Sequence, residues 1–170
     1  CYSISTIHLQ VSTTSFPVNY LQKMNRCDDD GLNDGYYSFD LEEATSDVLA
    51  QFPTEQNLSV FYYENLQDAL LNQNRIQNTS NYSNNQRHSQ FLYVRVQSND
   101  NGDCFGVGQY LQLTVNPLPE FRISQSDVLC FYGDPIALRI ENPTGNYSYI
   151  WTNESNEIIS TDVTAIIHLE

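Results

Sequence analysis

The spacing of four cysteines constrains the organisation of this chain more than any other feature. Cys27 follows Cys1 by 26 residues, and Cys130 follows Cys104 by the same 26 residues. The stretches CYSISTIHLQVSTTSFP and CFGVGQYLQLTVNPLP, which begin at Cys1 and Cys104, each carry an aromatic residue, an alternating apolar run and a proline-bearing exit. Self-similarity at a fixed period is typical of repeat architectures. The sequence therefore predicts a repeat of about 103 residues.

The repeat sets the predicted domain boundaries. We expect residues 1–14 to be the terminal strand of a preceding repeat, 17–118 to be one complete unit, and 119–168 to be the N-terminal part of a second, truncated unit. The final Leu169 and Glu170 are interpreted as a tag scar and are left out of functional reasoning.

Short strands separated by turn signals dominate both units. Runs that alternate or are rich in β-branched and aromatic residues predict strands at 58–64, 91–97, 110–115, 136–141, 147–152 and 163–168. Two short helical turns are predicted, over 41–52 behind Asp40 and over 66–71 behind a capping Asn65. This pattern predicts an all-β fold, an immunoglobulin-like β-sandwich followed by a truncated second immunoglobulin-like module, with Trp151 in the core of the second.

The charge balance argues against several classes of partner. The chain has 170 residues and carries 21 Asp and Glu against 7 Lys and Arg, a net charge of −14. Such a chain is repelled by nucleic-acid phosphates and by anionic membrane surfaces. No apolar run is long enough to span a bilayer. His8, His88 and His168 are scattered, and no nucleophile, phosphate-loop or metalloprotease motif occurs, so we do not expect an enzyme.

The motif strings CDDDGLNDGYYSFDL, VFYYENLQDALLNQNRI, FLYVRVQ and DCFGVGQYLQLTVNPLPE carry a family resemblance. Residues 17–118 resemble a repeat module of large secreted surface proteins of gliding, flavobacterium-like bacteria, which are exported by a type IX system and include adhesins. The segment from Phe121 onward is similar to the opening strands of a second immunoglobulin-like module. The resemblance implies a bacterial cell-surface location and a structural spacer that contacts neighbouring repeats.

The alternative to a spacer is a module that binds carbohydrate or another cell surface through its loops and tyrosines. Strand alternation places one ring of each pair, Tyr36–Tyr37 and Tyr62–Tyr63, on the outside. Outward rings would provide platforms for surface glycans.

In an exported protein, four spaced cysteines imply disulfides. One pairing joins Cys27 to Cys104 and leaves Cys1 and Cys130 for neighbouring units, and the other joins Cys1 to Cys27 and Cys104 to Cys130. The first is preferred here. Under it, the first 12 or so residues are expected to complete the truncated module by strand exchange, within a chain or between chains.

The run CDDDGLNDG raises the question of a metal. Asp28, Asp30 and Asp34 follow a D-x-D-G-x-x-D spacing that resembles calcium loops, and carboxylate oxygens suit Ca²⁺. A Cys27–Cys104 bond would add Asp103 to this cluster, with only Arg26 nearby to offset the charge. The sequence therefore favours a calcium site at Asp28, Asp30, Asp34 and Asp103, with a solvated acidic turn as the alternative.

Overall fold

The computed structural model describes residues 2–7, 11, 13–124, 135–141 and 147–168. The chain divides into two compact units, 1–117 and 118–170. Strands in several sheets with few short helices make the fold all-β and sandwich-like, as predicted. Each unit is described below by itself.

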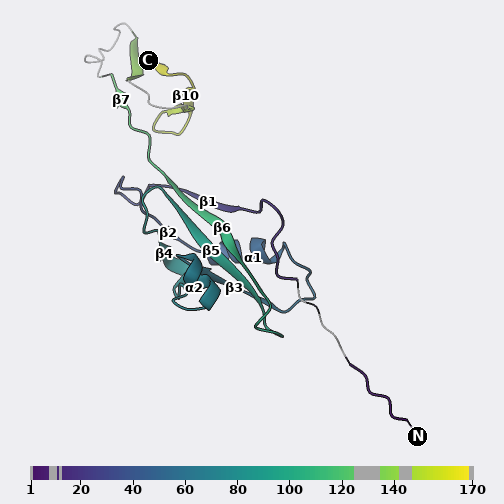
Figure 1. Cartoon of the computed structure of the whole chain (residues 1–170). Helices are drawn as coiled ribbons and strands as arrows, with labels where there is room; N and C mark the ends of the chain where they lie inside the picture. Colours follow the sequence, from purple (N-terminus) through teal and green to yellow (C-terminus); the bar gives the residue numbers. More distant parts are fainter. Residues whose placement is uncertain (1, 8–10, 12, 125–134, 142–146, 169–170) are drawn as a thin grey trace. The chain divides into compact units, whose positions relative to one another are not determined.

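The main sheet of the first unit has four strands in the order β1-β6-β5-β3 (Figure 1). Its strands are β1 (Gln22–Cys27), β3 (Leu58–Tyr63), β5 (Ser89–Ser98) and β6 (Phe105–Asn116). β5 runs antiparallel to both β3 and β6, whereas β1 runs parallel to β6. A two-stranded pair of β2 (Ser38–Phe39) and β4 (Tyr82–Ser83) lies apart from this sheet.

Strand β1 was not among the predicted strands. Its sequence, QKMNRC, is mostly polar, and only Met24 is buried. The strand exists because its backbone pairs with β6 from Gln22 opposite Leu111 to Cys27 opposite Asn116. A ladder of backbone hydrogen bonds needs no apolar alternation, so the side-chain pattern gave no signal for it.

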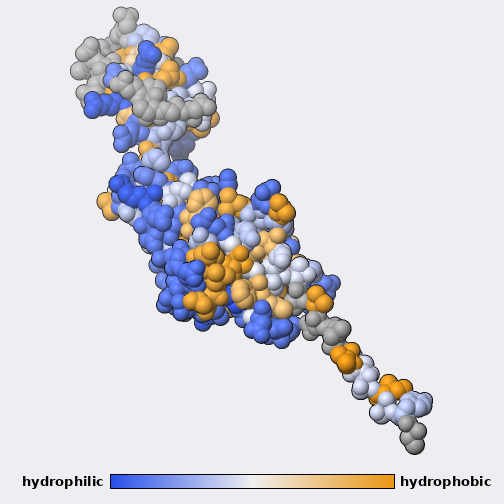
Figure 2. Space-filling view, in the orientation of Figure 1, coloured by the Kyte–Doolittle hydropathy of each residue, from blue (hydrophilic) through white to orange (hydrophobic). Residues whose placement is uncertain are grey.

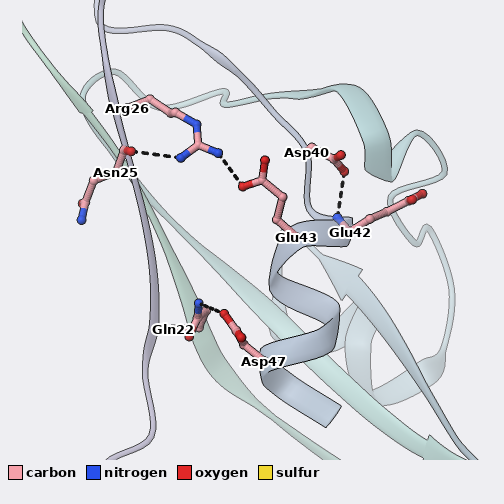
Figure 3. A network of polar contacts seen from close by, with 7 residues as sticks. All are labelled: Gln22, Asn25, Arg26, Asp40, Glu42, Glu43 and Asp47. Carbon is pink, nitrogen blue, oxygen red and sulfur yellow. Dashed lines mark hydrogen bonds and ion pairs between the residues drawn. The ribbon is translucent and has the colours of Figure 1, made fainter. Parts of the chain in front are cut away.

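Two short helices and one 3-10 turn, η1 (Thr79–Asn81), complete the unit. Asn65 caps α2 (Leu66–Leu71) by accepting a hydrogen bond from the Asp68 N–H, which confirms the predicted cap. α1 (Glu42–Leu49) is joined to β1 by two polar contacts, shown in Figure 3. They are the ion pair of Arg26 with Glu43 at 2.5 Å and the hydrogen bond from Gln22 to Asp47 at 2.7 Å.

The core of the first unit contains both tyrosines of β3, contrary to the expectation that one faces outward. Tyr62 is 2% exposed and Tyr63 is fully buried. The Tyr62 hydroxyl lies 2.9 Å from Thr45 of α1, and the Tyr63 hydroxyl donates to Asn72 just beyond α2. Tyr36 and Tyr37 are both half-buried. Because both Tyr62 and Tyr63 are buried, neither ring of β3 is available as a surface platform for glycans.

Burial of tyrosine predicts a loss of stability at alkaline pH. Desolvation raises the pKa of Tyr62 and of Tyr82 to about 12, from 10.0 for an exposed phenol. Because the folded pKa is the higher one, the stabilisation is fully present below pH 10 and is lost as the pH rises toward 12. We expect urea midpoints to stay level up to about pH 10 and then to fall. Tyr62→Phe, which removes one such group, should make the fall shallower; an equally steep fall contradicts the assignment.

Among its described residues, the second unit has a three-stranded sheet, β11-β8-β7, and a two-stranded pair, β10-β9. Trp151, predicted to be in the core, is half-buried and donates its indole N–H to the Asp162 carbonyl at 2.8 Å. It borders a hollow of about 320 Å³ whose lining includes Phe121, Tyr147 and Tyr149. The strands are β7 (Arg122–Ile123), β8 (Ile136–Glu141), β9 (Trp151–Thr152), β10 (Ile158–Ser160) and β11 (Thr164–Ile167).

Candidate functional site

The chain enters the first unit beside the start of β6. The Thr13 N–H donates to the Gln56 side chain at 2.7 Å, and Thr14 is buried. A Cβ placed on Gly106 would lie 1.8 Å from the Thr14 carbonyl oxygen, so the two backbones touch. Phe16 then stacks on Tyr110, with ring centroids 3.9 Å apart. The entry segment 13–21 therefore runs along β6 in the same direction as β1 does.

Cys104 lies at this entry end. It closes the turn between β5 and β6, where its N–H donates to Asn101 and its carbonyl accepts from the Ser98 N–H. The side chain is half-buried. Next to it, the guanidinium of Arg95 lies 3.5 Å from the centroid of the Phe105 ring. The thiol is thus held on an ordered turn at one end of the sheet.

Cys27 lies at the exit end. It is exposed and is paired in register with Asn116, the last residue of β6, one residue before Pro117. The Asp28 N–H donates to the Asn116 carbonyl at 2.9 Å, which extends the pairing by one residue. The thiol of Cys27 is therefore beside the point at which the chain leaves this unit.

The structure does not bring Cys27 and Cys104 together. Cys104 precedes Asn116 by twelve residues of nearly continuous strand, which spans about 40 Å at 3.3 Å per residue. A disulfide requires Cα atoms within about 4.4–6.8 Å. The preferred Cys27–Cys104 bond within one unit is incompatible with this register, because β1 is parallel to β6 and the two cysteines sit at opposite ends. Cys1 and Cys130 fall outside the described residues.

The same register separates the predicted calcium ligands. Asp103 adjoins Cys104 at the entry end, whereas Asp28, Asp30 and Asp34 follow Cys27 at the exit end. Asp103 is therefore not part of the loop at 28–35, since its place there depended on the disulfide. Among the residues that the structure describes, no three His, Cys, Asp or Glu side chains are grouped so as to hold a metal ion.

Asp28 closes the loop at 28–35 from within. It is fully buried, and its Oδ2 accepts a hydrogen bond from the Gly35 N–H at 2.6 Å. Its Oδ1 is buried and has no hydrogen-bond partner. Gly31 and Gly35 have φ of 100° and 80°, the left-handed region that other residues rarely adopt.

The other two aspartates of the loop stabilise its turns. Asp30 accepts from the Leu32 N–H and Asp34 from the Tyr36 N–H, each two residues ahead. The expected charge partner, Arg26, points instead to Glu43 on α1 (Figure 3). Arg87, which the sequence did not single out, donates to the Asp34 carbonyl at 2.6 Å.

Asp28 should stabilise the loop at 28–35 through the hydrogen bond that its Oδ2 accepts from the Gly35 N–H. Asp28→Ala leaves the buried Gly35 N–H unpaired and should lower the free energy of unfolding by about 1–2 kcal/mol. Asp28→Asn keeps an oxygen in place and should lose less than half of that. Urea unfolding of both variants measures the difference. Equal losses in the free energy of unfolding would contradict a stabilising role for this hydrogen bond.

The family described as the Flavobacterium inter-domain disulphide bond domain matches residues 23–119, more than half of the chain and a range that contains Cys27 and Cys104. Searches of curated proteins and of solved structures found no match. In the described part of the chain, no helix is long and apolar enough to cross a membrane. The family match suggests an extracellular flavobacterial domain. This chain belongs to the Flavobacterium inter-domain disulphide bond domain family.

Proposed function

We propose that this protein is a non-enzymatic structural repeat, a spacer in the stalk of an extracellular, adhesin-like surface protein. One observation carries the proposal: the two cysteines of the unit lie at opposite ends of the β1–β6 pair, one where the chain enters and one where it leaves. A bond from each end to a neighbouring repeat would fix both junctions. The long axis of the unit along β6 then sets how far each repeat extends the stalk.

The length of the stalk tests the spacer role. Deleting one repeat from the full-length protein should shorten the stalk by about 40 Å, the length of β6, and duplicating it should lengthen the stalk equally. Electron microscopy or atomic force microscopy of single molecules measures the change. Unchanged length combined with lost adhesion would show that the repeat binds rather than spaces.

A second candidate function, carbohydrate binding, is favoured by the hollow in the second unit. Phe121, Tyr147, Tyr149 and Trp151 line it with aromatic groups, which suit stacking on sugar rings. A glycan array of the chain and of Trp151→Ala tests this candidate. Hits that disappear in the variant support it, and hits that persist, or none at all, exclude this hollow.

Calcium binding by the loop at 28–35 stays a prediction, now without Asp103. It is supported by the buried Oδ1 of Asp28, which has no hydrogen-bond partner, and by the carboxylates of Asp30 and Asp34 in the same loop. At ten times its dissociation constant, Ca²⁺ would stabilise the unit by about 1.4 kcal/mol, a rise in melting temperature of about 4–8 °C. Thermal melts with Ca²⁺ and with EDTA test it, with Asp30→Asn as the variant in which the rise should disappear. Equal melting temperatures would leave a solvated acidic turn.

We also propose that the N-terminal segment pairs with a sheet edge of another chain by strand exchange. The N-terminal segment exposes large side chains at Tyr2, Ile4, Ile7 and Val11, each at least 80% exposed. Hydrophobic residues, in orange, lie along this N-terminal tail in Figure 2. An exposed apolar segment of strand-like sequence favours pairing with another sheet edge. We expect sedimentation velocity to show concentration-dependent dimers that Ile4→Asp with Ile7→Asp abolishes. A monomer at every concentration contradicts this.

A further inference from the structure

We propose that the first unit has a mechanical function: it resists unfolding when the chain is pulled by its two ends. The resistance comes from a shear clamp, which we define as β1 with the entry segment 13–21, held against β6. This function goes beyond spacing, because a spacer sets a length whether or not it withstands tension. It concerns the backbone of the first unit alone.

The parallel pairing of β1 with β6 sets the direction in which a pull loads the unit. The two strands lie side by side and run the same way, from Gln22 opposite Leu111 to Cys27 opposite Asn116 (Figure 1). The chain enters β1 at Gln22 and leaves β6 after Asn116, so the points of entry and exit lie at opposite ends of the paired stretch. Tension on the ends of the unit therefore pulls the two strands past each other along their axes.

The hydrogen bonds of this pair all carry the load together. The Asp28 N–H donates to the Asn116 carbonyl at 2.9 Å. Because the N–H groups of a strand point alternately to its two sides, those of Gln22, Met24 and Arg26 face β6 as well. Bonds between strands lie across the strands, so sliding strains all of them at once, whereas peeling breaks them one by one. Forced unfolding is governed by the rate of unfolding, which a simultaneous rupture makes slow.

The entry segment lengthens the sheared stretch. The Thr14 carbonyl lies against Gly106, so closely that a Cβ on this glycine would be 1.8 Å from the oxygen. The Phe16 ring stacks on Tyr110 with centroids 3.9 Å apart, and it meets Phe52 edge-on with centroids 5.1 Å apart. These contacts must slide before tension reaches β1, so the load is spread along most of β6.

Helix α1 holds β1 on a second side. Arg26 pairs with Glu43 at 2.5 Å and Gln22 donates to Asp47 at 2.7 Å, which ties both ends of β1 to the helix (Figure 3). The helix is anchored in the core by its own buried residues, and Met24 of β1 is buried in the same core. The polar strand is thus held by its backbone toward β6 and by its side chains toward α1.

Pulling one protein in two directions tests the clamp. Both measurements use a background in which the native cysteines are changed to serine, so that no disulfide carries load. In the first direction the chain is held by its ends, and in the second by cysteines introduced as Glu55→Cys and Asp103→Cys, at two exposed positions. These positions lie beyond the same end of the antiparallel β3–β5 pair, where Leu58 is opposite Ser98, so the second pull peels β3 from β5.

We expect the first unit to unfold at a higher force in the first direction than in the second. The step lengths identify the segment that unfolds. Residues 13–116 should add about 300–340 Å in the first direction, their contour length less about 40 Å of folded length, and residues 55–103 about 150–170 Å in the second. An equal or lower force in the first direction overturns the clamp, because overall stability is the same in both.

Two changes at Arg26 separate the backbone ladder from the ion pair. Arg26→Ala removes the pair with Glu43, and Arg26→Pro also removes the N–H that faces β6. The force in the first direction should fall more in Arg26→Pro than in Arg26→Ala, and the force in the second direction should change in neither. An equal fall in both directions would mean that β1 acts through overall stability, which overturns the clamp.

The comparison of the two directions in the parent decides the proposal even where Arg26→Pro does not fold. The stalk-length measurement above is independent of both tests, because a repeat can set a length without resisting force. A failed clamp therefore leaves the spacer role intact, and a failed spacer role leaves the forces unchanged.

Discussion

Arg95→Ala should destabilise the first unit more than any other single change that we consider. Arg95 is 4% exposed and donates to the carbonyls of Ala69 and Leu70 at the end of α2, at 2.9 and 3.1 Å. Its guanidinium also covers the Phe105 ring. Truncation leaves two carbonyls without their charged donor and removes the stacking, so we expect a loss of about 3–5 kcal/mol in the free energy of unfolding.

Two comparisons isolate the cause of that loss. Arg95→Lys keeps the charge but not the planar group, and it should lose about half as much. Arg75→Ala removes an exposed arginine from the Phe61 ring, with the carbon of its guanidinium 5.3 Å from the ring centroid, and it should cost under about 1 kcal/mol. Urea unfolding measures all three. A loss in Arg95→Ala no larger than in Arg75→Ala would contradict a supporting role for the buried guanidinium.

Arg95 should also affect the turn that carries Cys104. Because Phe105 follows Cys104 directly, loosening the ring should free the turn that holds this thiol. In a background with the other three cysteines changed to serine, Cys104 should react faster with a thiol reagent in Arg95→Ala than in the parent. Equal rates would mean that the arginine stabilises α2 alone.

Gly106→Val should release the entry segment from the sheet. Any Cβ at this position would lie 1.8 Å from the Thr14 carbonyl oxygen and 2.8 Å from its carbon, and both atoms belong to the backbone. One of the two backbones must therefore move, which we expect to cost about 2–3 kcal/mol. Chymotrypsin should then cleave after Tyr20, whose ring packs on Phe16 and Tyr110 in the parent.

Gly102→Ala is the matched control. A Cβ at Gly102 meets only the end of the flexible Gln97 side chain, at 3.2 Å, so that side chain can move aside. We expect its stability to lie within about 0.5 kcal/mol of the parent and its proteolysis pattern to be unchanged. Resistance of Gly106→Val to chymotrypsin would show that the entry segment does not depend on this close approach.

Local patterns predicted the elements whose side chains carry the signal. The predicted 136–141 strand is β8, Ile136–Glu141, and Asn65 caps α2 as its sequence position indicated. Those features depend on residues within one element, such as an alternation or a side-chain oxygen three residues from an N–H. The tyrosines of β3 were misplaced because alternation says which face a ring takes but not whether a helix covers that face.

The sequence by itself determined the all-β class and the order of the cysteines along the chain, because alternation and spacing are properties of the chain alone. The tertiary structure alone decided which residues Cys27 and Cys104 lie near. That outcome depends on one long-range choice, the parallel pairing of a polar β1 with β6, which places Cys27 beside Asn116 rather than Cys104. Backbone hydrogen bonds hold this pairing together. Because the backbone groups are the same in every residue except proline, no pattern of side chains predicts it.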